Sequence, residues 1–205
     1  MTLDQPNIRR ESGDDRRLAI AAAARAIIIE KGLEGLRTRD IAARVGINIA
    51  TLHYHVPSKE ALVALVADSL RRDFRAQAAR RPRAGKSGLE QLHLEFDDFR
   101  ETVLEMPDLI IILTELIARA RRDAAVAEIM IPMREFWRKQ VADVFRLGIA
   151  DGSFRPDIDP DAAALITTGA LSDCWRRSDI SRSLLDQVLA ELERAFVQTP
   201  NPLQE

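Results

Sequence analysis

The chain has 205 residues, 46% of them apolar, which is enough to bury the core of a globular protein. Its formal net charge of -2 provides no overall electrostatic attraction to nucleic acid. A single cysteine excludes an intramolecular disulfide framework and favours a reducing compartment. No apolar run approaches the roughly 20 residues of a membrane span, and the N-terminal stretch lacks the apolar region of a signal peptide. We therefore expect a cytoplasmic protein.

The charge is distributed unevenly along the chain. Residues 1–60 carry 10 Lys and Arg against 8 Asp and Glu, whereas residues 61–205 carry 20 against 24. A sequence-specific DNA-binding module needs only a local basic face, and a mildly acidic second part of the chain does not prevent one. The asymmetry is mild and indicates no function by itself.

Apolar residues recur at helical spacing along nearly the whole chain, without the alternation of strands bounded by hairpin turns. This pattern predicts an all-α fold. The first helix is expected to end at Gly32. Its apolar stripe is formed by Ile20, Ala23, Ala24, Ile27 and Ile28.

Two short helices are predicted next. Thr38 is a favourable N-cap for one that reaches Val45, and Asn48 for another that ends before Pro57. Gly46 separates the two.

Six longer helices complete the prediction. Ser58 is expected to cap a helix that runs to about Arg80, and the segment 80–88, rich in Pro, Gly and cationic residues, is expected to form a loop. A second loop is predicted at 151–160. The five later helices are predicted at 89–105, 108–122, around 126–150 with Pro132 starting or kinking it, 161–177 and 183–198.

The segment from Thr38 to Lys59 has the spacing of a helix-turn-helix. Small Ala42 permits two short helices to approach each other, and Gly46 permits the sharp turn between them. The second helix can then stand out from the domain and enter a DNA major groove, which is about 12 Å wide. An ordinary helical hairpin is the alternative. The predicted shared core consists of Ile41, Val45, Ile47, Leu52 and Val56.

The run GLEGLRTRDIAARVGINIATLHYHVPSKEAL, residues 32–62, resembles the DNA-binding region of TetR-family repressors. The resemblance covers residues 17–70 strongly, and the helix count and the loop at 151–160 more loosely. It implies a nine- or ten-helix dimer whose first three helices bind DNA and whose remainder binds a small effector. We accordingly expect a flexible arm at 1–15, a helix-turn-helix DNA-binding domain at 16–60 and an effector-binding and dimerisation domain at 61–205.

The resemblance also implies DNA contacts at the positions that match the family pattern. Thr38 and Arg39 begin the second helix, where family members contact a phosphate and a base edge, and Arg39 is the candidate for bidentate recognition of guanine. Tyr54, His55 and Lys59 match positions that anchor the phosphate backbone. The candidates for approaching the groove are Asn48, Ile49, Ala50, Thr51, His53 and Tyr54.

Two residues depart from the family pattern, so operator preference does not transfer from a relative. His53 stands where tyrosine is usual, and Ile49 stands where a polar base reader is common. Ile49 and Ala50 can read only thymine methyl groups. His53 and His55 are also compatible with plain surface positions, and their spacing on different faces of a helix disfavours a shared metal ion.

The helices after residue 88 carry large apolar side chains, and plain core packing is the simplest interpretation of any one of them. The family resemblance, however, implies an effector cavity among these helices. The aromatic and Met content there fits an adaptable apolar pocket. The candidate effector-binding residues are His93, Phe96, Phe99, Leu113, Met133, Phe136, Trp137 and Trp175.

The last two predicted helices have surfaces suited to self-association. One carries the small or apolar residues Ala162, Ala163, Ile166, Gly169 and Ala170. The other carries an apolar stripe of Leu185, Val188, Leu189, Leu192 and Phe196. Internal packing could use the same stripes. The family resemblance implies instead a homodimer through these two helices, with two recognition helices about 34 to 36 Å apart or somewhat farther.

These interpretations predict a sequence-specific DNA-binding transcriptional regulator, a repressor released from a palindromic operator by a small, largely apolar effector. One alternative is a helical small-molecule binding protein that has lost operator recognition, for which Ile49 and His53 give slight support. Another is an all-α enzyme that uses His93 and Asp97 for proton transfer, although a surface pair is the simpler interpretation. No phosphate loop, nucleophile elbow or paired carboxylates support catalysis. With three histidines and one cysteine, the sequence offers no persuasive metal site. We accordingly predict no enzyme and no cofactor.

Overall fold

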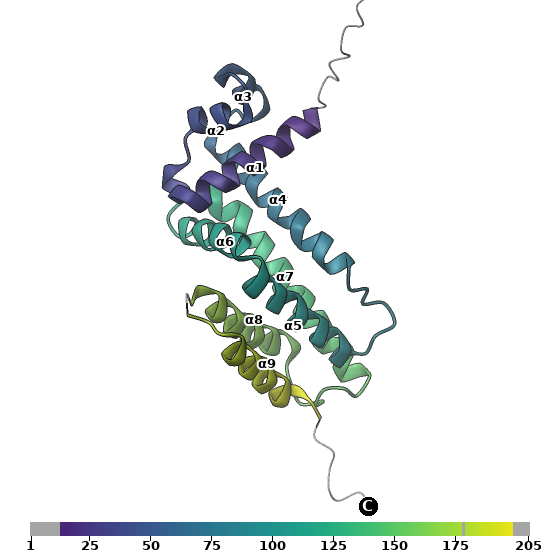
Figure 1. The fold of residues 1–205 in the computed structure, drawn as a ribbon. Helices are drawn as coiled ribbons and strands as arrows, with labels where there is room; N and C mark the ends of the chain where they lie inside the picture. The colour runs from purple at the N-terminus through teal and green to yellow at the C-terminus, as the bar shows by residue number, and fades with distance from the viewer. Residues whose placement is uncertain (1–12, 178, 199–205) are drawn as a thin grey trace, which may run out of the picture. The chain divides into compact units, whose positions relative to one another are not determined.

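The computed structural model describes residues 13–177 and 179–198. In these ranges the chain forms nine α-helices and one 3-10 helix, η1, which confirms the all-α prediction (Figure 1). The predicted arm at 1–15 lies outside the described residues except for 13–15, which begin the first helix. The elements are α1 Gly13–Lys31, η1 Leu33–Gly35, α2 Thr38–Val45, α3 Ile49–His55, α4 Lys59–Ala79, α5 Gly88–Glu105, α6 Pro107–Ala120, α7 Ala124–Ala150, α8 Pro160–Arg176 and α9 Arg182–Phe196.

The chain divides into two compact units, residues 1–70 and 71–205, and the division falls within α4. Each unit has its own packing. The functional assignment of residues 16–60 to DNA and 61–205 to effector and dimerisation stays a prediction.

In the first unit, α1 packs against η1, α2 and α3. Its buried face includes every residue of the predicted apolar stripe. The first half of α4 adds apolar residues that are at most 3% exposed, namely Leu62, Val63, Val66 and Leu70. The two short helices are therefore held by a small hydrophobic core.

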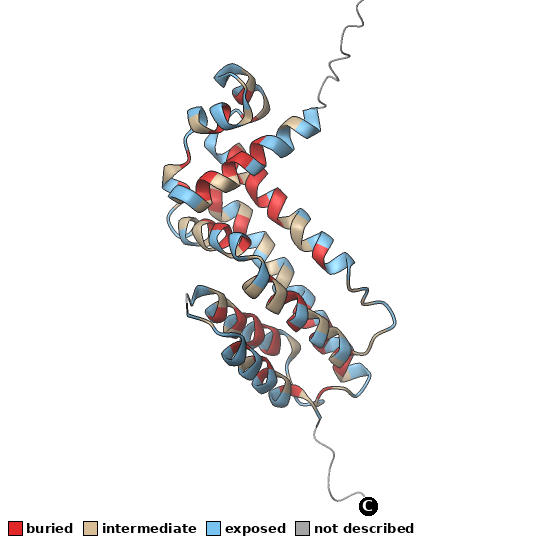
Figure 2. Cartoon of the chain, viewed as in Figure 1, coloured by how far each residue is buried: buried red, intermediate tan, exposed pale blue. Residues whose placement is uncertain are grey.

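In the second unit, α7 packs against α5, α6 and α8, and α9 packs against α8 and α5. Phe145 of α7 contacts the rings of Phe154 and Phe196 at centroid distances of 5.2 and 4.7 Å. Figure 2 shows buried residues along α8 and on one side of α9, whose other side is exposed. Pro132 lies inside α7, so it does not start that helix.

A close approach of backbones joins α5 to α7 in the second unit. A Cβ atom added at Gly88 would lie 2.2 Å from the Cα of Gly148, and one added at Gly148 would lie 2.0 Å from a ring carbon of Phe154. The Gly88 N–H also donates to the Asp151 carboxylate at 2.7 Å. Only glycine fits at this crossing, which lets the 151–159 loop bury Phe154 against the helices.

Candidate functional site

The turn between α2 and α3 follows from two local signals. Gly46 adopts φ 73° and ψ 33°, the left-handed conformation in which its N–H bonds to carbonyl groups at the end of α2. The Asn48 side chain accepts a hydrogen bond from the Thr51 N–H at 2.7 Å and so caps α3 as predicted. The prediction of Thr38 as the cap of α2 is wrong by one residue, because Arg37 occupies that position. A shift of one residue at a helix start leaves no clear trace in the sequence.

The helix-turn-helix is held by apolar contacts and by two links to α1. Ile41, Leu52 and Val56 are at most 4% exposed, whereas Val45 and Ile47, also predicted for the shared core, are only half-buried. Two bonds at 2.9 and 2.8 Å join the Arg44 guanidinium of α2 to the Glu30 carboxylate of α1. Arg17 of α1 donates to the carbonyl oxygen of His55 at 3.1 Å. These contacts fix α2 and α3 against α1.

The predicted DNA-contacting residues of α3 lie on its outer surface. Tyr54 is 85% exposed and Ile49 is 49% exposed, although residues of these types are usually buried. Asn48, Ala50 and His53 are exposed, and Thr51 and His55 are half-buried. Only Leu52 of α3 turns into the core. The helix therefore presents both polar and apolar groups outward, as reading of base edges and thymine methyl groups requires.

Cationic side chains flank this surface. The Arg39 side chain is 79% exposed, and its guanidinium lies 3.4 Å from the Asp40 carboxylate. Because such an exposed ion pair contributes little, it does not hold the Arg39 guanidinium tightly. Lys59, the first residue of α4, and Thr38, the first residue of α2, are also exposed. Arg37, which the sequence did not single out, lies beside them.

The second unit contains a column of aromatic rings from three helices. Trp137 of α7 stacks on Trp175 of α8 with a centroid distance of 5.6 Å, and Trp175 stacks on Phe99 of α5 at 6.1 Å. The indole N–H of Trp137 donates to the Glu95 carboxylate at 2.6 Å. Three of the predicted effector residues are thus brought together.

A cluster of charged side chains begins at Glu95 and extends toward the end of α4. Arg83 contacts both Glu95 at 2.8 Å and Asp98 at 3.0 Å, and Arg81 bonds Asp98 at 2.6 Å. Arg81 also contacts Glu101, and their hydrogen bond holds the pKa of the Glu101 carboxyl below its usual range. This cluster ties the loop after α4 to α5, beside the aromatic column.

The other predicted effector residues have varied surroundings. Phe96 and Leu113 are buried and Met133 is half-buried. Phe136 is 61% exposed and faces away from the core. His93 is exposed and lies 3.0 Å from the Glu193 carboxylate.

The proton-transfer pair considered from the sequence does not form. Asp97 accepts a hydrogen bond from Arg100 at 2.6 Å, whereas His93 bonds Glu193 of α9. In the described part of the chain, no group of three or more His, Cys, Asp or Glu side chains is close enough to hold a metal ion. None of the described helices is long and apolar enough to cross a membrane.

Known proteins resemble the chain in both sequence and fold. A family model described as bacterial regulatory proteins, tetR family, matches residues 20–66. The HTH-type transcriptional repressor KstR2 of Mycolicibacterium smegmatis is 31% identical over 164 residues, which cover 78% of this chain and 74% of that protein. The regulator EthR of Mycobacterium tuberculosis is 39% identical over 59 residues, 29% of this chain and 27% of that protein. A TetR-family regulator from a Rhodococcus species superimposes with a TM-score of 0.80 at 22% identity, covering 88% and 98% of the two chains.

The fold and the exposed recognition helix therefore define a helix-turn-helix, DNA-binding transcriptional regulator. The match to KstR2 extends over most of both chains, so it also identifies the family. The chain belongs to the TetR family, whose members bind operator DNA and small effectors and function as dimers.

Proposed function

We propose that this regulator is a repressor that leaves a palindromic operator when a small, largely apolar effector binds its second unit. The observation that carries the proposal is the outward face of α3, where Tyr54 and Ile49 are exposed and Arg39, Thr38 and Lys59 flank them. Exposed apolar groups rimmed by polar and cationic side chains are typical of an interaction site. A major groove fits that face in size and chemistry.

The aromatic column of Phe99, Trp137 and Trp175 is the proposed effector site. Three rings at stacking distance offer flat apolar contact area, and the Glu95 carboxylate beside them offers one polar partner. KstR2 of Mycobacterium tuberculosis is named a ketosteroid transcriptional regulator. Polycyclic apolar compounds are therefore the first effectors to test with this chain.

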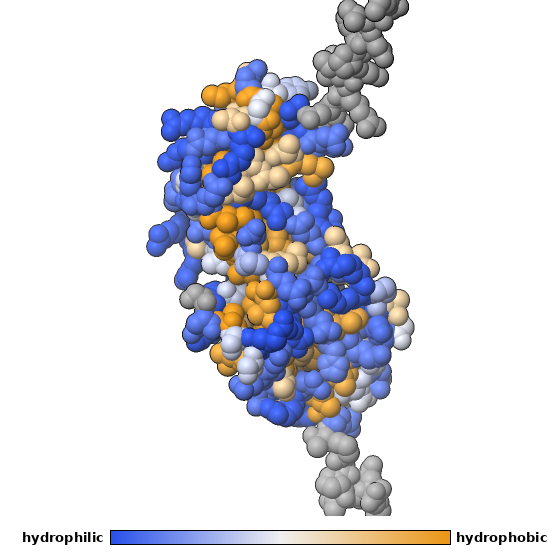
Figure 3. Space-filling model, viewed as in Figure 1, coloured by the Kyte–Doolittle hydropathy of each residue, from blue (hydrophilic) through white to orange (hydrophobic). Residues whose placement is uncertain are grey.

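The proposed dimer interface lies on the outer face of α8. Leu165 and Ile166 are 58% and 57% exposed there, and the space beside Gly169 is open. Figure 3 shows apolar surface over α8 among hydrophilic surroundings. The predicted stripe of α9 contributes less, because Leu185 and Leu189 are buried in the core of the same chain. A second copy packed on α8 would cover an apolar face that otherwise meets water.

The experiment for the DNA-binding site is selection of random duplex DNA by the purified protein, followed by binding titrations of the selected site. An enriched palindrome bound by a dimer supports the proposal. Arg39→Ala should then reduce discrimination at one base pair by about 1 to 3 kcal/mol, whereas Lys59→Ala should weaken all sequences alike and lower the salt slope by about one. Weak binding that vanishes with salt and selects no sequence would contradict an operator-binding function.

An effector can be identified from two signals, the tryptophan fluorescence of the protein and its release from the operator. The chain has two tryptophans, and both belong to the aromatic column, so their fluorescence reports on that site directly. A compound that changes this fluorescence and releases the selected operator over the same concentration range is an effector. By linkage, it must bind the operator complex more weakly by the factor by which it weakens operator binding.

A further inference from the structure

The aromatic column of the second unit ends beside a charged group. Among its three rings Trp175 lies in the middle, and Trp137 is the end ring on α7. Trp137 is only half-buried, so part of its indole surface is open to a further flat ring. Its N–H donates to one oxygen of the Glu95 carboxylate at 2.6 Å. A compound that stacks on Trp137 therefore has the Glu95 carboxylate at its edge.

Arg83 pairs with Glu95 and keeps one unused hydrogen-bond donor. Its Nη2 atom lies 2.8 Å from the other Glu95 oxygen and 3.0 Å from the Asp98 carboxylate. The Arg83 Nε atom is buried and meets no hydrogen-bond acceptor in the described part of the chain. Because Nε and Nη2 share one edge of the planar guanidinium, an oxygen atom bound at Nε would lie next to the Glu95 carboxylate. This edge therefore suits a group that accepts from Nε and donates to Glu95.

The charges around this edge are already balanced. Three arginines form ion pairs with three carboxylates, namely Arg80, Arg81 and Arg83 with Glu95, Asp98 and Glu101. The side chains of Asp98 and Glu95 are only 11% and 12% exposed, so an additional unpaired charge among them is costly. A carboxylate of a ligand would face Glu95 and Asp98, whereas a cation would face Arg83. The site therefore favours a neutral polar group.

We propose that the effector carries a neutral hydroxyl group on a flat apolar ring system, and that Glu95 and Arg83 bind this hydroxyl while the ring stacks on Trp137. A hydroxyl group is both donor and acceptor, so its oxygen accepts from the Arg83 Nε–H while its hydrogen is donated to Glu95. A methyl ether in the same place cannot donate, and a charged group meets a like charge. The proposal rests on the proposed function, since it names the class of effector for the same site.

Naphthalene derivatives substituted at the same ring position test the polar group of the effector: naphthol, methoxynaphthalene, naphthoate and naphthylmethylammonium. Isothermal titration calorimetry with the full chain measures their binding at neutral pH, and fluorescence anisotropy measures release of the selected operator. We expect naphthol to bind about ten- to a hundredfold more tightly than methoxynaphthalene, because the ether cannot donate a hydrogen bond to a charged group. Naphthol should also release the operator at the lowest concentration. Equal affinity of naphthol and methoxynaphthalene, or tightest binding of either ion, would overturn the proposal.

Glu95→Gln tests whether this carboxylate sets the preference for a neutral group. The amide keeps the size of the side chain and an oxygen for the Trp137 N–H, but it removes one of the two carboxylates that face Arg83. The order of affinities should therefore invert, with naphthoate gaining about tenfold or more relative to naphthol. Glu105→Gln, at the exposed end of α5, is the matched control and should keep the native order. An equal loss of affinity for all the probes in Glu95→Gln would indicate a structural role only and would overturn the assignment.

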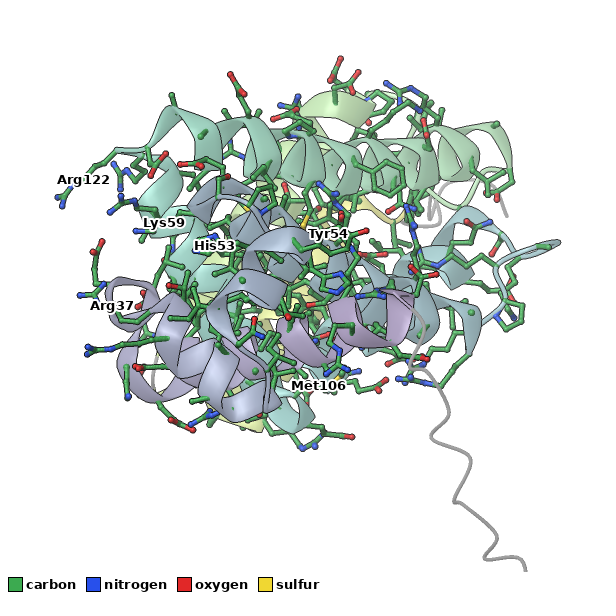
Figure 4. The ribbon with its side chains drawn as sticks, turned by 90° about the horizontal axis from the view of Figure 1, so that it is seen from above. Arg37, His53, Tyr54, Lys59, Met106 and Arg122 are labelled. Carbon is green, nitrogen blue, oxygen red and sulfur yellow. The ribbon has the colours of Figure 1, made fainter. Side chains whose placement is uncertain are left out.

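Arg83→Lys tests the Nε donor separately from the charge. Lysine keeps a positive charge for Glu95 and Asp98 but has no Nε–H. Naphthol and methoxynaphthalene should each lose about tenfold in affinity, because both oxygens accept from Nε, whereas unsubstituted naphthalene should lose nothing. Arg122→Lys, at an exposed position between α6 and α7 (Figure 4), is the matched control and should change none of these affinities. Unchanged binding of naphthol by Arg83→Lys would refute the role of Arg83.

The operator-binding function and the class of effector can be tested separately. Failure to select any operator would contradict the proposed function itself. If an operator is selected but naphthol does not bind the protein, or releases the operator no better than naphthalene does, only the hydroxyl class of effector is contradicted.

Discussion

Replacing Leu165 and Ile166 of α8 by serine should dissociate the dimer. Full burial of a Leu or Ile side chain contributes about 1.5 to 3 kcal/mol. These two are 58% and 57% exposed in the isolated chain, so each has about 1 to 2 kcal/mol left to gain by burial. A two-fold interface contains each residue twice, and the loss therefore sums to about 4 to 7 kcal/mol, or three to five decades in the dissociation constant.

Sedimentation velocity over a concentration series measures this change directly. Circular dichroism should remain helical, because both side chains are exposed in the protomer. Ile111→Ser is the matched control, since Ile111 is an exposed apolar residue, 40% accessible, on α6. An unchanged dimer dissociation constant in the double variant would refute the interface on α8. Two linked DNA-binding domains bind a palindrome more tightly than one domain does. The monomeric variant should therefore also lose most of its operator affinity.

Three further predictions concern the second unit. Gly148→Ala should lower the free energy of unfolding by about 3 kcal/mol or more, because the new Cβ would lie 2.0 Å from the Phe154 ring; an unchanged denaturation midpoint would show that the ring can move aside. Trp137→Phe removes the N–H that donates to Glu95 and should cost about 1 to 2 kcal/mol in urea unfolding while lowering sensitivity to effectors; equal stability would mean that this hydrogen bond contributes nothing. Burial raises the pKa of the Cys174 thiol, so it should react with a thiol reagent only as fast as the unit opens; rapid labelling of the native protein would contradict its buried position.

Local signals in the sequence were sufficient for most of the secondary structure. Gly46, Asn48 and Ser58 each act on the backbone within four residues, so their effect does not depend on the rest of the fold. The capping box of Ser87 and Glu90 starts α5 in the same way, close to the predicted residue 89. The apolar stripe of α1 is equally local in origin, since helical periodicity alone puts its residues on one face.

The sequence does not predict which way each side chain of a helix points. Phe136 and Trp137 were both predicted to line an apolar pocket, yet Phe136 faces outward and Trp137 joins the aromatic column. One helix position changes the direction of a side chain by about 100°, and the sequence does not say which direction meets a neighbour. The same ambiguity affected the last two helices, where α9 uses its stripe for the core of its own chain and α8 leaves an apolar face exposed.

The sequence by itself determined the helical class, the helix-turn-helix and the family resemblance, because each depends on spacing between near neighbours in the chain. Only the tertiary structure decided which side chains gather from distant elements. Arg37 carries no motif of its own, and only the packing of the first unit places it on one small cleft with His53 of α3 and Lys59 of α4. The stack of Phe99, Trp137 and Trp175 likewise depends on the packing of three helices, since burial of apolar area selects among arrangements that local periodicity leaves equivalent.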